Sequence, residues 1–406
     1  MYSHILVALD GSQRSQWAGQ AVMELARATG AKVTACHVYG VEIHRTRFIE
    51  MEPGLPAQYQ DKQTLDDLQS AHDQLMGEGF RALSAGYLED FAAACRQADI
   101  PIEAATIQGR SYVGLLHLAQ TYKPDLIVMG IDGIGAIGDG MLGGTTLRVL
   151  YNAPCDLLFV RRPPVNGPIV AGVDGSDPSL AAVAQAASLA KLTKKTVRLV
   201  AAYDPEFHTR AFTVMAHSLS PQRQQQVGLA KQEKLHNDII DEGLKTLYAK
   251  FLGDAESRVG GNGITVATSL VTGRAYAALN TQAQECLADM IIVGRYGHHR
   301  QAVSRLGSNA ENLLRLASAN VLLVGGVEAT LEPAPPVGHA VETTDPAAVE
   351  WDDDAAARLD RVPSFVRHIA KAAVENAVRK AGNTRISAAD FDAVAGQFGM
   401  GKGRPS

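Results

Sequence analysis

The sequence has few cysteines, and those it has are widely separated. Cys36, Cys95, Cys155 and Cys286 form no CxxC pair, and this spacing argues against a zinc site, an iron–sulfur cluster and a disulfide framework. The chain also lacks an uninterrupted apolar run of about 20 residues, the length that a helix needs to cross a bilayer. Its first residues enter an apolar segment at once, without a basic leader or cleavage site. These absences predict a cytoplasmic protein with reduced thiols and no membrane association.

A strong excess of charge of either sign is absent as well. The formal net charge is −5 for 406 residues, with a pI near 6.2, so the overall charge does not favour nucleic acid as a partner. What is present is ordinary for a folded protein, with 46% hydrophobic and 20% charged residues. At about 100–200 residues per domain, this length predicts several domains, each with its own core.

The sequence repeats itself at one constant offset. HILVALDGS at His4 recurs as PIVAGVDGS at Pro168, which pairs Asp10 with Asp174 at a separation of 164 residues. The same separation relates five further pairs: Gly109 and Gly273, Asp125 and Asp289, Gly130 and Gly294, Gly133 and Gly297, and Gly143 and Gly307. Six matches in one register indicate a duplication, and a period this long predicts that each copy is a domain.

Each copy alternates short apolar segments with amphipathic ones. Both begin with an aliphatic strand, followed by a helix that Ser12 or Ser176 can cap. Strands are expected at 5–9, 33–38, 102–107, 125–130 and 156–160, and at 169–173, 197–202, 264–270, 289–294 and 320–324. Long helices are expected over 58–98 and 222–252, and shorter ones over 112–122 and 276–286. The fourth strands, DLIVMG and DMIIVG, are apolar throughout, as strands covered on both faces should be. The pattern predicts α/β domains with a parallel sheet between helices.

A glycine-bearing loop follows the fourth strand in each copy. In the second copy it reads GRYGHHRQAVSRLGSN from Gly294, with the form Gly-x2-Gly-x9-Gly-Ser before a helix. Glycines let backbone N–H groups approach an anion closely, and a helix N-terminus adds unpaired donors. Ser308 can donate a hydroxyl hydrogen bond, and Arg295, Arg300 and Arg305 are candidate cations. The loop therefore predicts a phosphate site.

This motif resembles the phosphate loop of the ATP-binding branch of the universal stress protein family, and the resemblance covers both copies, about residues 1–326. It implies two tandem five-stranded Rossmann-like domains of strand order 3-2-1-4-5, which brings the first and fourth strand ends together at the topological switch point. It also implies ATP as the cofactor, with an accompanying Mg²⁺ left open. In the second copy the resemblance implies the following contacts with an adenine nucleotide: Asp174, Ala202, Gly294, Gly297, Gly307, Ser308 and Asn309.

The first copy keeps the three glycines of the motif but loses other features. Gly144 replaces the serine, and the loop carries Asp132 and Asp139 but no lysine or arginine. By resemblance its site comprises Asp10, Val38, Gly130, Gly133, Gly143 and Thr145, in which the threonine substitutes for the serine. We expect the second copy to be the stronger ATP site. A flexible connector that has lost its ligand is the alternative for the first loop.

Two groups of candidate residues also have plainer interpretations. Asp10 and Asp174 lie in Asp-Gly turns, where aspartate commonly forms the turn, but the matching glycine loops favour contact with a ligand. His298 and His299 are adjacent in a loop and no third ligand is evident, so we interpret them as solvated side chains and predict no metal site.

The composition changes after Gly326. Four prolines and many acidic residues over 328–350 predict an extended tether, and residues 351–400 predict a small all-α module whose second helix Ser387 can cap. The module resembles the C-terminal segment of the B subunit of light-independent protochlorophyllide reductase, through these residues: Leu359, Pro363, Phe365, Val366 and Arg367. A histone-type helix–loop–helix is a second, shorter resemblance. The predicted domains are 1–163, 164–327, the tether 328–350 and the module 351–400.

The predicted function is regulatory. No segment supplies an activated nucleophile or a Walker-type lysine, so the family resemblance implies slow ATP hydrolysis or autophosphorylation at most. We expect a nucleotide-responsive stress protein whose C-terminal module docks on an unknown protein partner. The alternatives are a tetrapyrrole- or redox-associated protein and a nucleotide-free structural stress protein. The apolar last strands, DLLFV and NVLLV, should pair within one chain as an intramolecular pseudo-dimer, with a homo-oligomer left open.

Overall fold

The computed structural model describes most of the two repeats and part of the C-terminal segment. The described residues are 1–40, 46–47, 49–56, 59, 61–133, 142–205, 213–214, 216, 218–229, 231–232, 242–261, 263–298, 306–326, 350–360, 371, 374–375, 377–378 and 383–397. The chain forms two compact units, one comprising Met1–Val41 and Leu75–Pro335, the other Glu42–Gln74 and Pro336–Ser406. All strands of both repeats lie in the first unit, whereas residues 42–74 of repeat 1, with the first part of its long helix, belong to the second.

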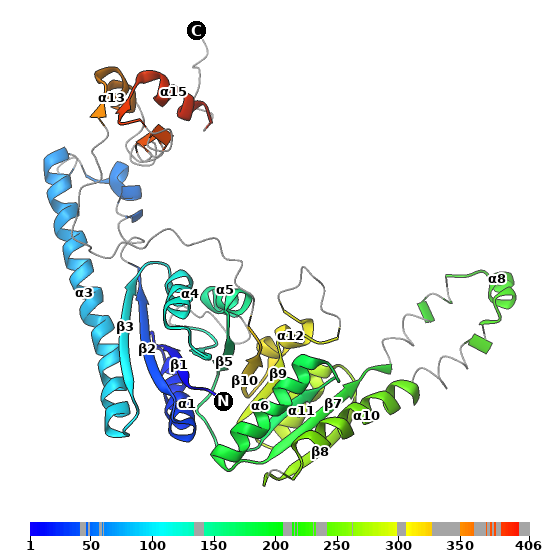
Figure 1. The fold of residues 1–406 in the computed structure, drawn as a ribbon. Helices are drawn as coiled ribbons and strands as arrows, with labels where there is room; N and C mark the ends of the chain where they lie inside the picture. Colours follow the sequence, from blue (N-terminus) through cyan, green and yellow to red (C-terminus); the bar gives the residue numbers. More distant parts are fainter. Residues whose placement is uncertain are drawn as a thin grey trace. The chain divides into compact units, whose positions relative to one another are not determined.

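Repeat 1 places helices on both faces of a parallel sheet (Figure 1). Its strands are β1 (His4–Ala8), β2 (Lys32–Tyr39), β3 (Ile102–Gln108), β4 (Leu126–Gly130) and β5 (Asp156–Val160). Its helices are α1 (Gln13–Thr29), α3 (Lys62–Gln97), α4 (Ser111–Tyr122) and α5 (Gly144–Asn152). The order β3-β2-β1-β4-β5, all parallel, confirms the predicted topology.

Repeat 2 has the same order, β8-β7-β6-β9-β10. Its strands are β6 (Ile169–Val173), β7 (Val197–Tyr203), β8 (Val266–Thr272), β9 (Met290–Gly294) and β10 (Asn320–Val324). Its helices are α6 (Asp177–Thr193), α8 (Pro221–Gln226), α10 (Glu242–Val259), α11 (Ala275–Glu285) and α12 (Ser308–Leu316). The helix predicted over 222–252 is described only as α8 and α10, and β8 begins two residues later than expected.

Apolar side chains form one layer of core on each face of the sheet. Residues of α1, α3, α6 and α10 share one buried cluster, and residues of α4, α5, α11 and α12 share the other. Both predicted caps are present, because Ser12 Oγ accepts a hydrogen bond from the backbone N–H of Ser15, and Ser176 Oγ one from that of Ser179, at 3.2 and 3.3 Å. These caps start α1 and α6 just beyond the carboxyl ends of β1 and β6.

The last strands of the two repeats pair with each other. β5 and β10 are antiparallel, with Phe159 opposite Val321 and Leu157 opposite Leu323, and all four side chains are buried. The pairing joins the repeats into one ten-stranded sheet. The predicted pairing of the last strands within one chain is therefore present, and neither apolar edge is left open.

Two side chains at equivalent positions hold this junction reciprocally. Asp156 Oδ1 accepts a hydrogen bond from the backbone N–H of Gly325 at 2.8 Å, across the junction. Asn320, 164 residues after Asp156, accepts one from the N–H of Arg161 at 2.9 Å. Each repeat therefore caps the chain that leaves the last strand of the other, but only repeat 1 uses an ionisable group.

Replacing that group with asparagine should stabilise the protein at neutral pH. Burial raises the pKa of Asp156 above its ordinary value of 3.8, so the folded state binds the proton more tightly than the unfolded state does. The stability of the protein therefore falls as the pH rises from 3.8 through the raised pKa. Asp156→Asn keeps an oxygen for Gly325 and removes this loss. Urea midpoints should show a gain over wild type that grows above pH 3.8 and then levels off. Asn320→Asp, the matched control, should lose stability at pH 7; a gain there would contradict this account.

The second unit contains a small apolar cluster in the C-terminal segment. Its described elements are η1 (Glu52–Gly54), β11 (Glu350–Trp351), α13 (Asp353–Asp360), β12 (Arg385–Ile386) and α15 (Ala388–Gln397). The cluster is formed by Ala355, Val374, Val378, Ile386 and Phe391. Ser387 caps the last helix as predicted, since its Oγ accepts from the N–H of Asp390 at 3.3 Å.

This module is helical as predicted, with one addition. β11 and β12 form a two-residue parallel pairing, which is too short to leave a periodic pattern in the sequence. The tether was predicted over 328–350, and its last residue, Glu350, begins β11. The rest of it lies outside the described residues, as do Pro363, Phe365, Val366 and Arg367. Among the helices that the structure describes, none has the length and apolar character needed to span a membrane.

Candidate functional site

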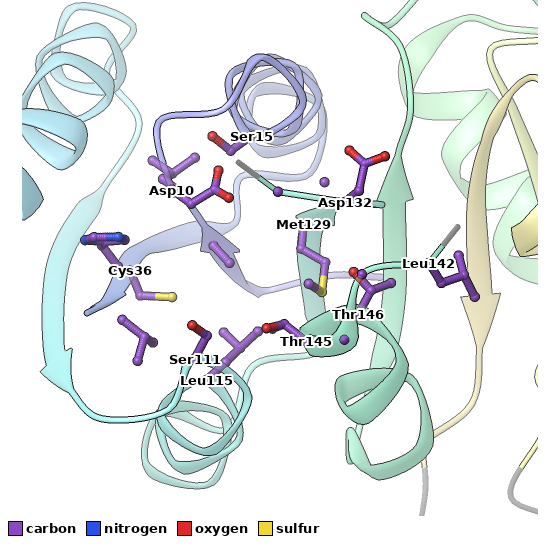
Figure 2. Close-up of a pocket in the computed structure, with 18 residues that line it drawn as sticks. Asp10, Ser15, Cys36, Ser111, Leu115, Met129, Asp132, Leu142, Thr145 and Thr146 are labelled. Atoms are coloured by element: carbon purple, nitrogen blue, oxygen red, sulfur yellow. The ribbon is translucent and has the colours of Figure 1, made fainter. Parts of the chain in front are cut away.

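The carboxyl ends of β1, β2 and β4 in repeat 1 border a cavity of about 460 Å³ (Figure 2). This volume lies within the usual range for small-molecule sites. All six residues predicted for the repeat line it: Asp10, Val38, Gly130, Gly133, Gly143 and Thr145. They lie far apart in the sequence and converge because the strand order brings the first and fourth strands together at the switch point.

The aspartate after the first strand is packed against the glycine loop in both repeats. One carboxylate oxygen accepts the backbone N–H two residues further on, at 3.0 Å for Asp10 and 2.9 Å for Asp174. The other oxygen would lie 2.4 Å from a Cβ atom added at Gly133, or 2.6 Å from one added at Gly297. Neither glycine has a left-handed φ. A side chain at either glycine would therefore meet the carboxylate, and the aspartate or the loop would have to shift to admit it.

The helices that follow the loops start without a side-chain cap. Gly143 and Gly307 are the N-cap residues of α5 and α12, and neither provides a capping oxygen. The first backbone N–H groups of these helices are therefore available to an anion. Thr145 and Thr146 both line the cavity. The hydroxyl of Thr146 is buried and donates to the carbonyl of Ile131 at 2.8 Å, and Thr145 is the residue predicted to substitute for the serine.

Several lining residues were missed by the sequence analysis. They include Ser15, Cys36, His37, Ser111 and Leu115. Ser111 begins α4 just after β3, and its equivalent in repeat 2 is Ala275. Its place beyond the carboxyl end of a strand was the signal that could have identified it, because that edge carries the site.

An ion pair between Arg14 of α1 and Asp132, which lines the cavity, joins this helix to the glycine loop. Arg14 Nη1 lies 2.8 Å from Asp132 Oδ2, with side-chain exposures of 23% and 10%. A Cβ added at Gly130 would lie 3.0 Å from Cβ of Arg14, so the arginine is adjacent to the first glycine of the motif. In Figure 2 the Asp132 carboxylate points away from Thr146. The loop aspartate is therefore neutralised by a cation that the loop sequence does not contain.

Two titratable groups in the cavity are held in their neutral forms. Burial raises the pKa of the Cys36 thiol to about 12, so it is protonated at neutral pH and is a poor nucleophile. Burial also lowers the pKa of His37, whose Nδ1 lies 2.7 Å from Ser84 Oγ and whose ring is 5.3 Å from that of Tyr87. This chemistry suits ligand binding better than covalent catalysis.

In repeat 2 the structure brings together part of the predicted set. Gly307 donates its N–H to the carbonyl of Arg295 at 2.9 Å, close to the contact between Gly297 and Asp174 described above. Ser308 and Asn309 are exposed at the first turn of α12, and Ala202 is buried near the end of β7. Arg300 and Arg305 lie outside the described residues.

His298 is exposed but is not simply solvated. Its Nε2 lies 2.6 Å from the carbonyl oxygen of Asp174, and its ring centroid is 5.6 Å from that of Phe251. It folds over the turn that holds the site aspartate. His299 lies outside the described part, and within that part no three side chains are grouped to hold a metal ion.

Arg295, a candidate cation for the phosphate site, is used elsewhere. Its side chain is 0% exposed. Its Nε donates to the carbonyl of Gly325 at 2.6 Å, and its Nη atoms donate across the junction to the carbonyls of Leu150 and Cys155, at 2.6 and 3.3 Å. Leu150 lies in the last turn of α5, where orphan carbonyls and the helix dipole favour a cation, and Cys155 directly precedes β5. Arg295 therefore ties the second glycine loop to repeat 1.

An arginine of repeat 1 likewise binds the end of a helix in repeat 2, but it comes from a different position in the repeat. Arg161 donates to the carbonyl of Leu314 at the end of α12, and Leu314 is the equivalent of Leu150. The equivalents of Arg295 and Arg161 are Ile131 and Gly325. Both helix ends are thus held by an arginine of the other repeat, supplied from two non-equivalent positions.

Comparisons with known proteins agree with both resemblances. The model of the universal stress protein family matches residues 1–161 and 166–325, and the model of the proto-chlorophyllide reductase 57 kD subunit matches 351–394. The chain is similar to the universal stress protein in the QAH/OAS sulfhydrylase 3′ region of Thermus aquaticus, with 30% identity over 161 residues, 40% of this chain and all of that protein.

Two solved structures share the fold over both repeats. One is a universal stress protein from Archaeoglobus fulgidus DSM 4304, with a TM-score of 0.51 and 16% identity over 79% of this chain and 98% of that one. The other is a functionally unknown protein from Pseudomonas aeruginosa PAO1, with a TM-score of 0.53 and 15% identity over 80% and 93% of the two chains. At these identities the likeness concerns the fold alone.

Proposed function

Because the chain belongs to the universal stress protein family, we propose that it binds adenine nucleotides at the carboxyl edge of its sheet and acts as a regulatory protein in a stress response. One observation carries the proposal. The six residues that the family resemblance assigned to repeat 1 line one cavity of about 460 Å³ at the switch point of that repeat. A motif that arose by chance would give no reason for these residues to meet around one cavity.

Each part of the site has a role in this proposal. The free oxygen of Asp10 or Asp174 accepts hydrogen bonds from ribose hydroxyls, and the backbone at Val38 or Ala202 borders the base. The glycine loop and the first turn of α5 or α12 hold the phosphates through backbone N–H groups. ATP, with Mg²⁺ bound to its phosphates, is the ligand of repeat 2, where Ser308 adds a hydroxyl and the loop sequence adds Arg300 and Arg305.

The role is binding and reporting rather than efficient catalysis. The thiol and imidazole at the cavity of repeat 1 are neutral for the reasons given above, and the sequence offers no Walker-type lysine. Slow hydrolysis or autophosphorylation is the most that the site supports. The segment from 351 onward, with its own apolar cluster, docks on a protein partner in the cytoplasm and reports the nucleotide state.

The test is to identify what the protein binds. Full-length protein purified under mild conditions should release AMP or ATP on denaturation, detected by mass spectrometry, and nucleotide-free protein should bind ATP in a calorimetric titration. Neither bound nucleotide nor ATP binding would favour the structural alternative. A visible absorbance band from a bound pigment would instead favour the tetrapyrrole-associated alternative, which the match over 351–394 suggests.

A further inference from the structure

Among the described residues, the lining of the cavity in repeat 1 includes two carboxylates, those of Asp10 and Asp132, and no lysine or arginine. We infer that it binds an adenine nucleoside or its monophosphate and discriminates against ATP, an inference that rests on the proposed function. The two repeats then hold different forms of one ligand, so that the protein responds to the phosphorylation state of adenine compounds rather than to ATP alone.

The charge balance follows from the lining residues. They include Asp10 and Asp132 but no lysine or arginine, and residues 134–141, which complete the loop, add only Asp139 as a charged residue. Arg14 is the cation adjacent to the loop, and it lies 2.8 Å from the Asp132 carboxylate. The lining that the structure describes therefore offers no lysine or arginine to balance the phosphates of a nucleotide. A carboxylate about 4 Å from a phosphate costs about 1 kcal/mol in water and about 4 kcal/mol near a protein surface.

The other lining groups suit a base and a sugar. Val38, Leu115 and Met129 supply apolar contact area, and the hydroxyls of Ser111 and Thr145 lie among them (Figure 2). Sites for small ligands commonly combine apolar walls with a few placed polar groups. A nucleoside can satisfy these hydroxyls and the free oxygen of Asp10, and it brings no phosphate charges that a cation of the lining would have to balance.

Repeat 2 differs at the same positions. Pro178 and Tyr296 stand where repeat 1 has Arg14 and Asp132, and Ser308 stands where it has Gly144. The second loop also contains Arg300 and Arg305, whose equivalents in the first loop are uncharged. The selectivity is therefore assigned to a charge arrangement that only one repeat has, on a backbone that both share.

Competition among adenosine, AMP and ATP tests the inference on the full-length chain. Calorimetry on Gly297→Val, which blocks repeat 2, should show one site for adenosine and AMP, with ATP bound at least about tenfold more weakly than AMP, or about 1.4 kcal/mol. In wild type, AMP should fill two sites per chain and ATP one site at the same free concentration. This comparison tests the selectivity of repeat 1 even if the Gly297→Val variant does not fold. Equal binding of AMP and ATP in repeat 1 would overturn the inference.

A second variant tests the charge arrangement itself. Asp132→Asn in the Gly297→Val protein removes the negative charge that lies 2.8 Å from Arg14 Nη1, so the loop becomes more positive. It should raise ATP affinity about tenfold while adenosine affinity changes by less than about threefold. Glu89→Gln removes the same charge beside an exposed arginine, Arg96, and should change neither. An unchanged ratio of ATP to adenosine affinity in Asp132→Asn would refute the inference. Failure of every adenine compound to bind wild type would refute the proposed function itself.

Discussion

Replacing Arg295 with leucine is expected to lower the free energy of unfolding by about 3 kcal/mol. The guanidinium is fully buried and donates to three backbone carbonyls, two of them in the other repeat. Hydrogen bonds that involve a charged group contribute about 1.5–3 kcal/mol each. Part of this gain is offset by desolvation of the guanidinium, which also lowers the pKa of Arg295. Leucine would remove the charge and the donors to the carbonyls of Gly325, Leu150 and Cys155.

Chemical denaturation followed by circular dichroism measures the effect, through the midpoint and its slope. Arg295→Lys retains a charge but not the three-way donor geometry, and should fall between leucine and wild type. Arg258→Leu, at an exposed position of α10, is the matched control and should change stability by less than about 0.5 kcal/mol. A loss below about 1 kcal/mol for Arg295→Leu would mean that the junction does not depend on this residue.

The sequence allowed the fold and the edge of the site to be predicted because both depend on local patterns. Apolar runs bounded by glycine, and helices started by Ser12 and Ser176, each report on a few neighbouring residues. The constant offset then required both copies to share one topology. Once the first and fourth strands are neighbours, Asp10 and Gly133 must lie near each other, and the structure places them in contact.

The contacts of the Arg295 side chain could not be predicted in this way. From the sequence it is a cation inside a phosphate motif, and the motif alone favours a role in ligand binding. Its partner Leu150 is 145 residues away in the other repeat. That contact exists only after β5 and β10 have paired, when the end of one helix meets the loop of the other repeat. No periodicity or spacing within either copy carries this information.

The charge of the first site was misjudged for a similar reason. From the sequence, Asp132 is an unpaired acidic residue of the phosphate loop, because the loop itself contains no lysine or arginine. The structure pairs it with Arg14 from the start of α1, which lies on the same edge of the sheet but more than a hundred residues earlier. Counting charges within a loop fails when a neighbouring element supplies the counter-ion.

Gly297→Val should abolish the tighter ATP-binding event, whereas Gly133→Val should leave it nearly intact. In both loops a Cβ atom would meet the free oxygen of the site aspartate, at 2.6 Å for Asp174 and 2.4 Å for Asp10. The loop or the carboxylate must then move, and the backbone donors lose their alignment with the phosphates. The two substitutions therefore cause the same steric clash in their own loops, and a difference in ATP binding between the variants shows which repeat binds ATP.

We expect Gly297→Val to weaken the tight event by at least about 100-fold, or about 2.8 kcal/mol, and Gly133→Val to change it by less than about threefold. Calorimetric titration of ATP into both variants and wild type measures this, with urea midpoints to show that each variant is folded. The inequality follows from Ser308 and the cations in the second loop sequence, against Gly144 and no cation in the first. The reverse result would assign ATP to repeat 1. Equal losses would mean that the two loops act as one unit, which the contacts of Arg295 with the end of α5 would then explain.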